Sequence, residues 1–225
     1  MIEVEMKAKI TKDIANQIIT DRVAGFKINR GGGWAPLYKK DTYYSLHGTT
    51  PKEIKDIIRI RQSSTVDSQT HNIFDAIING KIKALSPVPG MSKTFLTTKC
   101  KNVDEFGVER NREIEGPMFD TTVEAFENAM KIANFAPYFV KEKTAASFYV
   151  LEESTKYEMH CEIVNVNGVG PYLEIECFAD DKLYCMHEGC FASTEKAKEL
   201  IQRYFRAIGI TEFETRNWIE LTKSR

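Results

Sequence analysis

Charged side chains recur at two-residue spacing in five short stretches of this chain, and this pattern limits the folds that it can adopt. The stretches are Glu3-Val4-Glu5-Met6-Lys7, Arg59-Ile60-Arg61, Lys99-Cys100-Lys101, Arg110-Asn111-Arg112 and Glu174-Ile175-Glu176. In a β-strand, residues i and i+2 lie on the same face, so each stretch places a strip of charge on one face and mostly apolar residues on the other. Carboxylates on two strands and cations on three others indicate a site for metal ions and a polyanion.

A water-exposed strand face is the ordinary explanation for any single pair of this kind, because antiparallel strands normally turn their polar face to solvent. The repetition argues against that explanation for the whole set, since like charges side by side destabilise a sheet. Such pairs become favourable when a group of opposite sign binds them. We therefore expect the charged faces to surround a common binding site.

Length and composition limit the class of protein. The chain has 225 residues, of which 42% are hydrophobic and 28% charged, so it can bury a sizeable core. A formal net charge of -1 and scattered aromatic residues argue against nucleic acid as the ligand. No apolar run of about 18 residues and no leader segment is present, which predicts a soluble, cytoplasmic protein without membrane contact. Five cysteines without a C-x-x-C pair indicate neither a disulfide framework nor a structural zinc site.

Hydrophobic periodicity predicts an α+β chain in which strands outnumber helices. The clearest expected strands span residues 2–9, 93–101, 109–115, 138–143, 146–151, 157–166 and 171–178. The clearest expected helices span residues 11–24, 123–134 and 193–208. Residues 62–92 fit no single pattern, and we interpret them as an insertion or flap within one domain of residues 1–225.

The opening residues Glu3 to Lys7 resemble the E-x-E-x-K signature of the CYTH domain. This group of triphosphate tunnel metalloenzymes includes class IV adenylate cyclases, thiamine triphosphatases and inorganic tripolyphosphatases. Further segments are similar to motifs of the family in the same order, and the resemblance covers nearly the whole chain. These segments are Asp41-Thr42-Tyr43-Tyr44, Arg59-Ile60-Arg61, Leu96-Thr97-Thr98-Lys99, Arg112-Glu113-Ile114-Glu115, the stretch from Gly168 to Glu176 and the stretch from Glu214 to Leu221.

The resemblance implies an eight-stranded antiparallel β-barrel that forms a tunnel, with a charged interior and helices outside. It also implies that Mg²⁺ or Mn²⁺ is bound by carboxylates and that phosphates are bound by arginine and lysine. The expected metal ligands are Glu3, Glu5, Glu174 and Glu176, which together with Lys7 form the expected catalytic set. The expected substrate-binding residues are Lys7, Arg59, Arg61, Lys99, Arg112 and Lys143.

One position departs from the family pattern. Val164 stands where the family usually has an acidic residue, four residues before the first glycine of the Gly168-Val169-Gly170 segment. Glu162 lies two residues earlier, on the same face of the expected strand, and is the candidate to replace it. His160 shares this face. The departure bears on whether a second metal ion can bind.

Three functions are compatible with these residues. The first is a metal-dependent hydrolase of inorganic tripolyphosphate, thiamine triphosphate or a nucleoside triphosphate, which needs only the generic tunnel residues. The second is a class IV-type adenylate cyclase that makes cyclic AMP from ATP, which also needs an adenine pocket. The third is a non-catalytic binder of a phosphorylated ligand. The expected partner is a small-molecule triphosphate, and a homodimer is compatible with the sequence.

Overall fold

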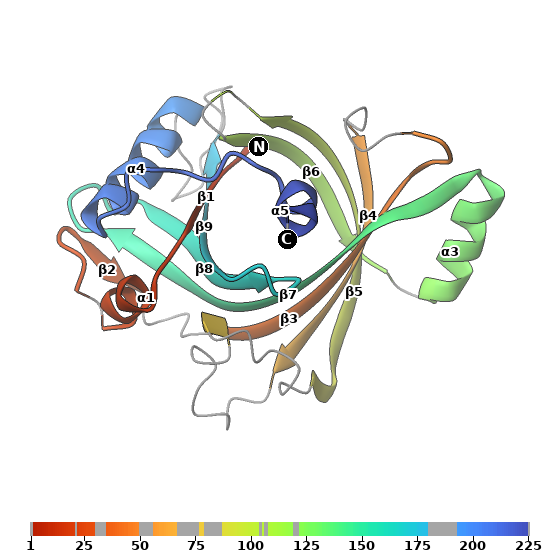
Figure 1. The fold of residues 1–225 in the computed structure, drawn as a ribbon, viewed down its shortest axis with the longest axis horizontal. Helices are drawn as coiled ribbons and strands as arrows, with labels where there is room; N and C mark the ends of the chain where they lie inside the picture. The colour runs from red at the N-terminus through yellow and green to blue at the C-terminus, as the bar shows by residue number, and fades with distance from the viewer. Residues whose placement is uncertain are drawn as a thin grey trace.

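The computed structural model describes residues 2–20, 22–29, 35–49, 56–66, 77–78, 87–103, 105, 108–118, 122–179 and 193–224 (Figure 1). Its strands are β1 (Ile2–Lys9), β2 (Phe26–Ile28), β3 (Ala35–Leu46), β4 (Asp56–Val66), β5 (Pro87–Val103), β6 (Glu109–Pro117), β7 (Phe135–Glu152), β8 (Glu158–Val166) and β9 (Pro171–Ala179). Its helices are α1 (Lys12–Ile19), α3 (Val123–Ile132), α4 (Thr194–Ala207) and α5 (Trp218–Lys223).

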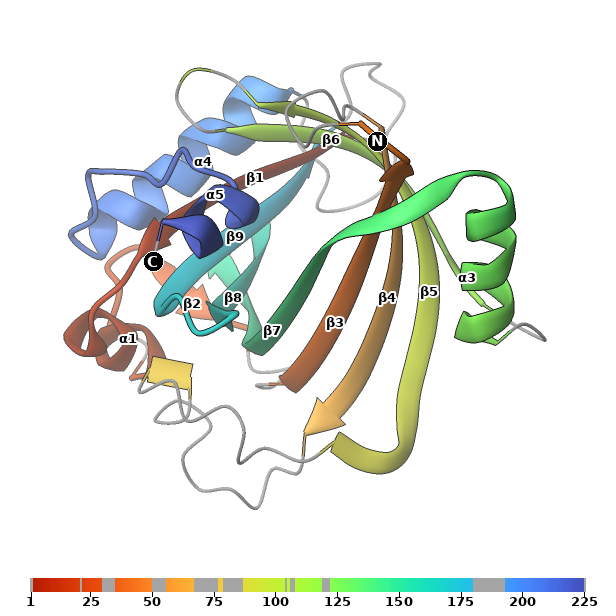
Figure 2. The ribbon, with the colours of Figure 1, turned by 45° about the vertical axis from the view of Figure 1, so that its right-hand side comes forward.

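The strands close into a barrel. Their order is β2-β7-β3-β4-β5-β6-β1-β9-β8, and β7 also pairs with β8, so the eight strands other than β2 form a ring. Every pair is antiparallel. Figure 2 shows the tilted strands around the ring, with α1, α3 and α4 on the outside. The predicted α+β class and the eight-stranded antiparallel barrel are confirmed.

The spacing of charges along β1 explains which face points inward. Val4 and Met6 are buried on the outer face, where they join a hydrophobic cluster with Ile201 and Phe205 of α4. Residues i and i+2 share a face, so Glu3 and Glu5 point to the interior. The helix supplies the apolar partner that the strand needs, and the barrel interior is left to the charged residues.

The two strands expected over 138–143 and 146–151 are one continuous strand, β7. Ala145 and Ala146 lie in the middle of β7, and alanine is less common in strands than β-branched residues. These two alanines interrupt the sequence pattern of a strand, although the strand itself continues through them. Both ends of the expected insertion at 62–92 belong to strands of the barrel, because β4 continues to Val66 and β5 begins at Pro87. Between these strands, only residues 77 and 78 are among the described ones, and Ile77 is buried in the core.

Helix α5 lies over part of one opening of the barrel, as Figure 1 shows. Its N-terminus has a capping box, in which Asn217 and Glu220 exchange side-chain to backbone hydrogen bonds. Leu221 of this helix packs into a buried cluster with Ala145, Val164, Val166 and Tyr172. Val164 is thus a core residue at this end of the barrel. Among the described residues, no helix is both long enough and apolar enough to span a membrane.

Candidate active site

The barrel interior contains a cavity of about 410 Å³ that is lined mainly by ionisable side chains. Carboxylates line it from β1, β6 and β9, and we call them the carboxylate wall: Glu3, Glu5, Glu109, Glu113, Glu115, Glu174 and Glu176. Cations line it from β3, β4, β5 and β7, and we call them the cation wall: Lys39, Arg59, Arg61, Lys99, Lys141 and Lys143. Each wall consists of strands that are neighbours in the ring, so the cavity has one acidic and one basic side.

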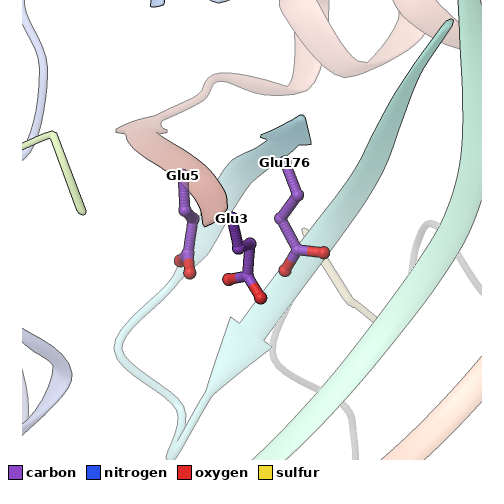
Figure 3. Close-up of side chains that lie close together, drawn as sticks. All are labelled: Glu3, Glu5 and Glu176. Atoms are coloured by element: carbon purple, nitrogen blue, oxygen red, sulfur yellow. The ribbon is translucent and has the colours of Figure 1, made fainter. Parts of the chain in front are cut away.

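Three members of the carboxylate wall lie close enough together to bind one metal ion. Glu3, Glu5 and Glu176 each have an oxygen within 4.8 Å of the others, and their side chains point the same way (Figure 3). The antiparallel register places Glu5 directly opposite Glu176, which explains why residues so far apart in sequence meet. Mg²⁺ and Mn²⁺ favour oxygen ligands of this kind.

The electrostatics of this cluster fit a cation. Burial and the neighbouring charge of Glu176 raise the pKa of Glu3 to about 7, although Lys99 acts in the opposite direction. Burial, followed by repulsion from Glu109, raises the pKa of Glu5 well above its ordinary value. Neighbouring carboxylates disfavour each other's ionisation, and a bound divalent ion removes this repulsion. The donor set and its charge therefore match Mg²⁺ or Mn²⁺.

Glu176 differs from the other two members of the cluster because a histidine contacts it. The Nδ1 atom of His160 lies 2.9 Å from Oε2 of Glu176. Burial alone would raise the pKa of Glu176, but the hydrogen bond and charge of His160 outweigh it and lower the pKa to about 2.

Glu174 was expected as a fourth metal ligand, but the structure places its carboxylate outside this cluster. The carboxylate accepts hydrogen bonds from Lys143 and from Nε1 of Trp218, the latter at 2.8 Å. Glu162, the candidate to replace the acidic residue missing at Val164, pairs with Lys143 and with Lys39, the latter at 2.8 Å. Both carboxylates are therefore neutralised by lysines of the cation wall.

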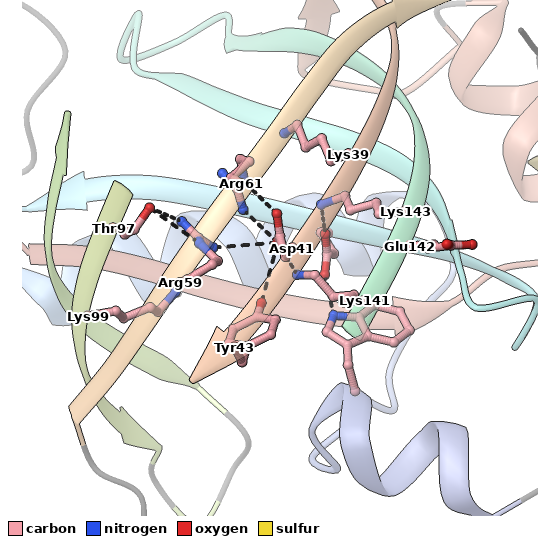
Figure 4. Close-up of polar contacts among 12 residues, drawn as sticks. Lys39, Asp41, Tyr43, Arg59, Arg61, Thr97, Lys99, Lys141, Glu142 and Lys143 are labelled. Carbon is pink, nitrogen blue, oxygen red and sulfur yellow. Dashed lines mark hydrogen bonds and ion pairs between the residues drawn. The ribbon is translucent and has the colours of Figure 1, made fainter. Parts of the chain in front are cut away.

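Asp41 organises the cation wall (Figure 4). Its carboxylate is fully buried and accepts two hydrogen bonds from Arg61, at 2.9 and 3.1 Å. The ammonium of Lys141 lies 3.3 Å away and the guanidinium of Arg59 lies 3.7 Å away. Burial would raise the pKa of Asp41, but these cations hold it well below its ordinary value. One anion thus holds three cations together, and their remaining charge faces the cavity.

Arg59 and Lys99 connect the two walls. Arg59 donates to Thr97 and lies 3.0 Å from Glu115. Lys99 lies 2.5 Å from Glu113 and 3.6 Å from Glu3. Phosphate oxygens entering the cavity can replace these carboxylates as partners of the cations.

The structure does not place Arg112 in the tunnel, where it was expected to bind substrate. The register pairs Lys99 with Glu113 and Cys100 with Arg112, so Arg112 belongs to the outer face, and its side chain is exposed. Arg110 also lies on the outer face, 3.7 Å from Glu195 of α4. The arginines of β6 point outward because its alternate residues, which include Glu113, occupy the inner face.

The structure brings most of the expected residues together. Glu3, Glu5, Glu176, Arg59, Arg61, Lys99 and Lys143 all line the cavity, as does Glu174. Lys7 is buried toward the α5 end, 3.8 Å from Glu109 and 5.8 Å from the ring centre of Trp218.

Several lining residues were not predicted. They include Lys39, Glu109, Glu113, Glu115 and His160. For most of them a signal was present, because Lys39, Asp41 and Tyr43, like Glu109, Asn111, Glu113 and Glu115, are spaced by two residues. Their mixed charges conceal the pattern, which is recognised only when the strand register is known.

No protein-family model and no curated protein matches the chain. Solved structures do match it over nearly its whole length. The PH1819 protein from Pyrococcus horikoshii OT3 has a TM-score of 0.68 at 20% sequence identity and covers 99% of both chains. A “putative adenylate cyclase” from Vibrio parahaemolyticus has a TM-score of 0.61 at 10% identity, with 99% of this chain and 98% of that chain covered.

A third structure is the “putative adenylyl cyclase HpAC1” from Hippeastrum, which is described as having a dominant triphosphatase activity. Its TM-score is 0.53 at 13% identity, and the match covers 99% of this chain and 95% of that chain. At these identities the likeness concerns the fold. Together with the closed barrel and its charged interior, it shows that this chain shares the fold of these proteins, the barrel expected from its resemblance to the CYTH domain.

Proposed function

We propose that the protein is a metal-dependent hydrolase of a triphosphate-containing substrate. The observation that carries the proposal is the cluster of Glu3, Glu5 and Glu176 facing the cation wall across one cavity. Phosphoryl transfer depends mainly on positioning and on neutralising the charge of the phosphate oxygens. The two walls provide both functions with the residues present.

The roles follow from the residue types. Glu3, Glu5 and Glu176 would hold Mg²⁺ or Mn²⁺, which when bound neutralises phosphate oxygens and activates a water molecule. Arg59 and Arg61 offer planar guanidinium groups that bind phosphate oxygens in pairs. Lys39, Lys99, Lys141 and Lys143 add positive charge around the same cavity. In this arrangement the substrate would lie between the carboxylate cluster and the cation wall.

Adenylate cyclase activity is the second candidate. It would use the same metal and the same grip on the triphosphate, with the ribose 3′-hydroxyl replacing water as the nucleophile. The Hippeastrum protein supports placing hydrolysis first, because its cyclase description is accompanied by a dominant triphosphatase activity. A non-catalytic binder would use the cation wall without turnover.

Product analysis tests the proposal. The protein is incubated with tripolyphosphate, thiamine triphosphate and ATP, each with Mg²⁺ or Mn²⁺, and the products are separated by ion exchange and identified by ³¹P NMR. Metal-dependent release of orthophosphate is the expected result, and the relative rates rank the substrates. Pyrophosphate with cyclic AMP from ATP would indicate the cyclase. Saturable binding without any turnover would overturn the proposal in favour of a binder.

A further inference from the structure

We infer that His160 is a positioning residue that holds the carboxylate of Glu176 in place for the metal, and that Ser147 in turn holds His160. The inference rests on the proposed function. The three residues lie on adjacent strands of the ring, β7, β8 and β9. His160 is opposite Glu176 in the register of β8 and β9, so the strand pairing brings the two side chains together.

Both ring nitrogens of His160 are engaged. Nδ1 lies 2.9 Å from Oε2 of Glu176, and Nε2 lies 2.7 Å from Oγ of Ser147. An ionised carboxylate only accepts hydrogen bonds, so the proton of this pair is on Nδ1, and Nε2 shares a second hydrogen bond with the Ser147 hydroxyl. The ring of Tyr149 lies against the imidazole, with 5.1 Å between ring centres. These contacts fix both the position and the rotation of the imidazole.

The consequence for the site concerns Glu176. It is the member of the metal-binding cluster that comes from β9, whereas Glu3 and Glu5 both come from β1. A glutamate side chain has several rotatable bonds, and freezing them on metal binding costs conformational entropy. A hydrogen bond to one carboxylate oxygen orients the group in advance and leaves the other oxygen for the metal. His160 lines the cavity but is not one of the three clustered carboxylates, so its role is to orient a ligand.

Binding of Mn²⁺ alone to the metal-free, full-length protein tests the inference, measured by electron paramagnetic resonance titration. His160→Ala should weaken Mn²⁺ binding by roughly 10-fold to 100-fold, the usual effect of losing a partner of a metal ligand. His160→Asn keeps an N–H donor near the position of Nδ1 and should restore most of the affinity. Ser147→Ala should give a smaller loss than His160→Ala. The control is His47→Ala, because His47 is exposed and is not among the residues that line the cavity.

Turnover gives a second readout. With His160→Ala, activity lost at low Mn²⁺ should return at saturating Mn²⁺, because the residue acts on metal affinity. Wild-type affinity in His160→Ala would overturn the inference. Equal losses in His160→Ala and His160→Asn, with lower melting temperatures of the metal-free proteins, would show a purely structural role and overturn it as well. If the wild-type protein binds no Mn²⁺, the proposed metal-dependent function fails first, and the inference fails with it.

Discussion

Replacing Asp41 by asparagine tests the most concentrated charge arrangement in the molecule. The side chain keeps its size, but the anion that holds Arg59, Arg61 and Lys141 together is lost. All three cations are largely buried and would face one another with less compensation. We expect the metal-free protein to lose stability while keeping its fold.

The magnitude follows from the contacts. Removing one partner of a buried ion pair costs about 3–5 kcal/mol, because the remaining charge stays buried without compensation. Arg59 keeps Glu115 at 3.0 Å, so the lower end of this range applies. For a domain of this size, 1 kcal/mol corresponds to about 2–4 °C in melting temperature, so Asp41→Asn should melt about 6–12 °C lower.

The pH dependence provides a second check on the same variant. The pKa of Asp41 in the folded protein lies well below its ordinary value of 3.8, whereas in the unfolded chain it returns to that value. The stabilisation from ionised Asp41 is therefore complete above about pH 4 and is lost as the pH falls through the folded pKa. The difference between the wild-type and variant melting temperatures should be constant near neutrality and shrink in acid.

Calorimetry of both metal-free proteins between pH 3 and 7 measures these effects. Glu153→Gln is the matched control, because its carboxylate lies 2.8 Å from Lys27 in an exposed pair that solvent screens. This control should melt close to the wild type. Equal melting of wild type and Asp41→Asn at pH 7, or a difference that grows in acid, would refute the reasoning. Added tripolyphosphate should stabilise Asp41→Asn more than the wild type, since the anion meets cations that lack their carboxylate.

Three further substitutions test other parts of the site. Glu5→Gln should lower metal-dependent turnover by roughly 100-fold or more, since losing a metal ligand has at least as large an effect as losing a group that hydrogen-bonds to a ligand. Calorimetry of the metal-free variant should show no loss of stability, because burial already disfavours the ionised form of Glu5. Arg112→Ala should leave both turnover and melting temperature close to the wild type, and a loss of activity in this variant would contradict its outward position. Trp218→Phe removes the N–H donor to the buried Glu174 carboxylate and should cost about 1–3 kcal/mol in urea unfolding; unchanged stability would argue that another donor takes its place.

Much of the fold could be predicted because the charge pattern and the motifs agree. The spacing of Glu3 and Glu5 around Val4 specifies a strand with one charged and one apolar face, and β1 has these faces. The boundaries of β1 at Ile2 and Lys9 match the expected strand at both ends.

The direction in which the other side chains point could be recognised only from the register of the strand pairs, which depends on contacts between residues distant in sequence. In β6, Arg112 and Glu113 are both charged, so the sequence does not show which of them points inward. Pairing with β5 decides it in favour of Glu113. His160 was noticed but given no role for a related reason, since its importance comes from Glu176 on another strand and cannot be recognised from its own neighbours.

The position of α5 limits how a long polyphosphate chain could bind as a substrate. Leu221 and Val164 belong to a buried apolar cluster at this opening, and it is unfavourable to bury ionised phosphates against apolar side chains. A polyphosphate chain is therefore expected to enter the cavity by its terminus and to leave by the route along which it entered. Such an enzyme would shorten polyphosphate from its ends and leave the internal bonds of the polymer intact.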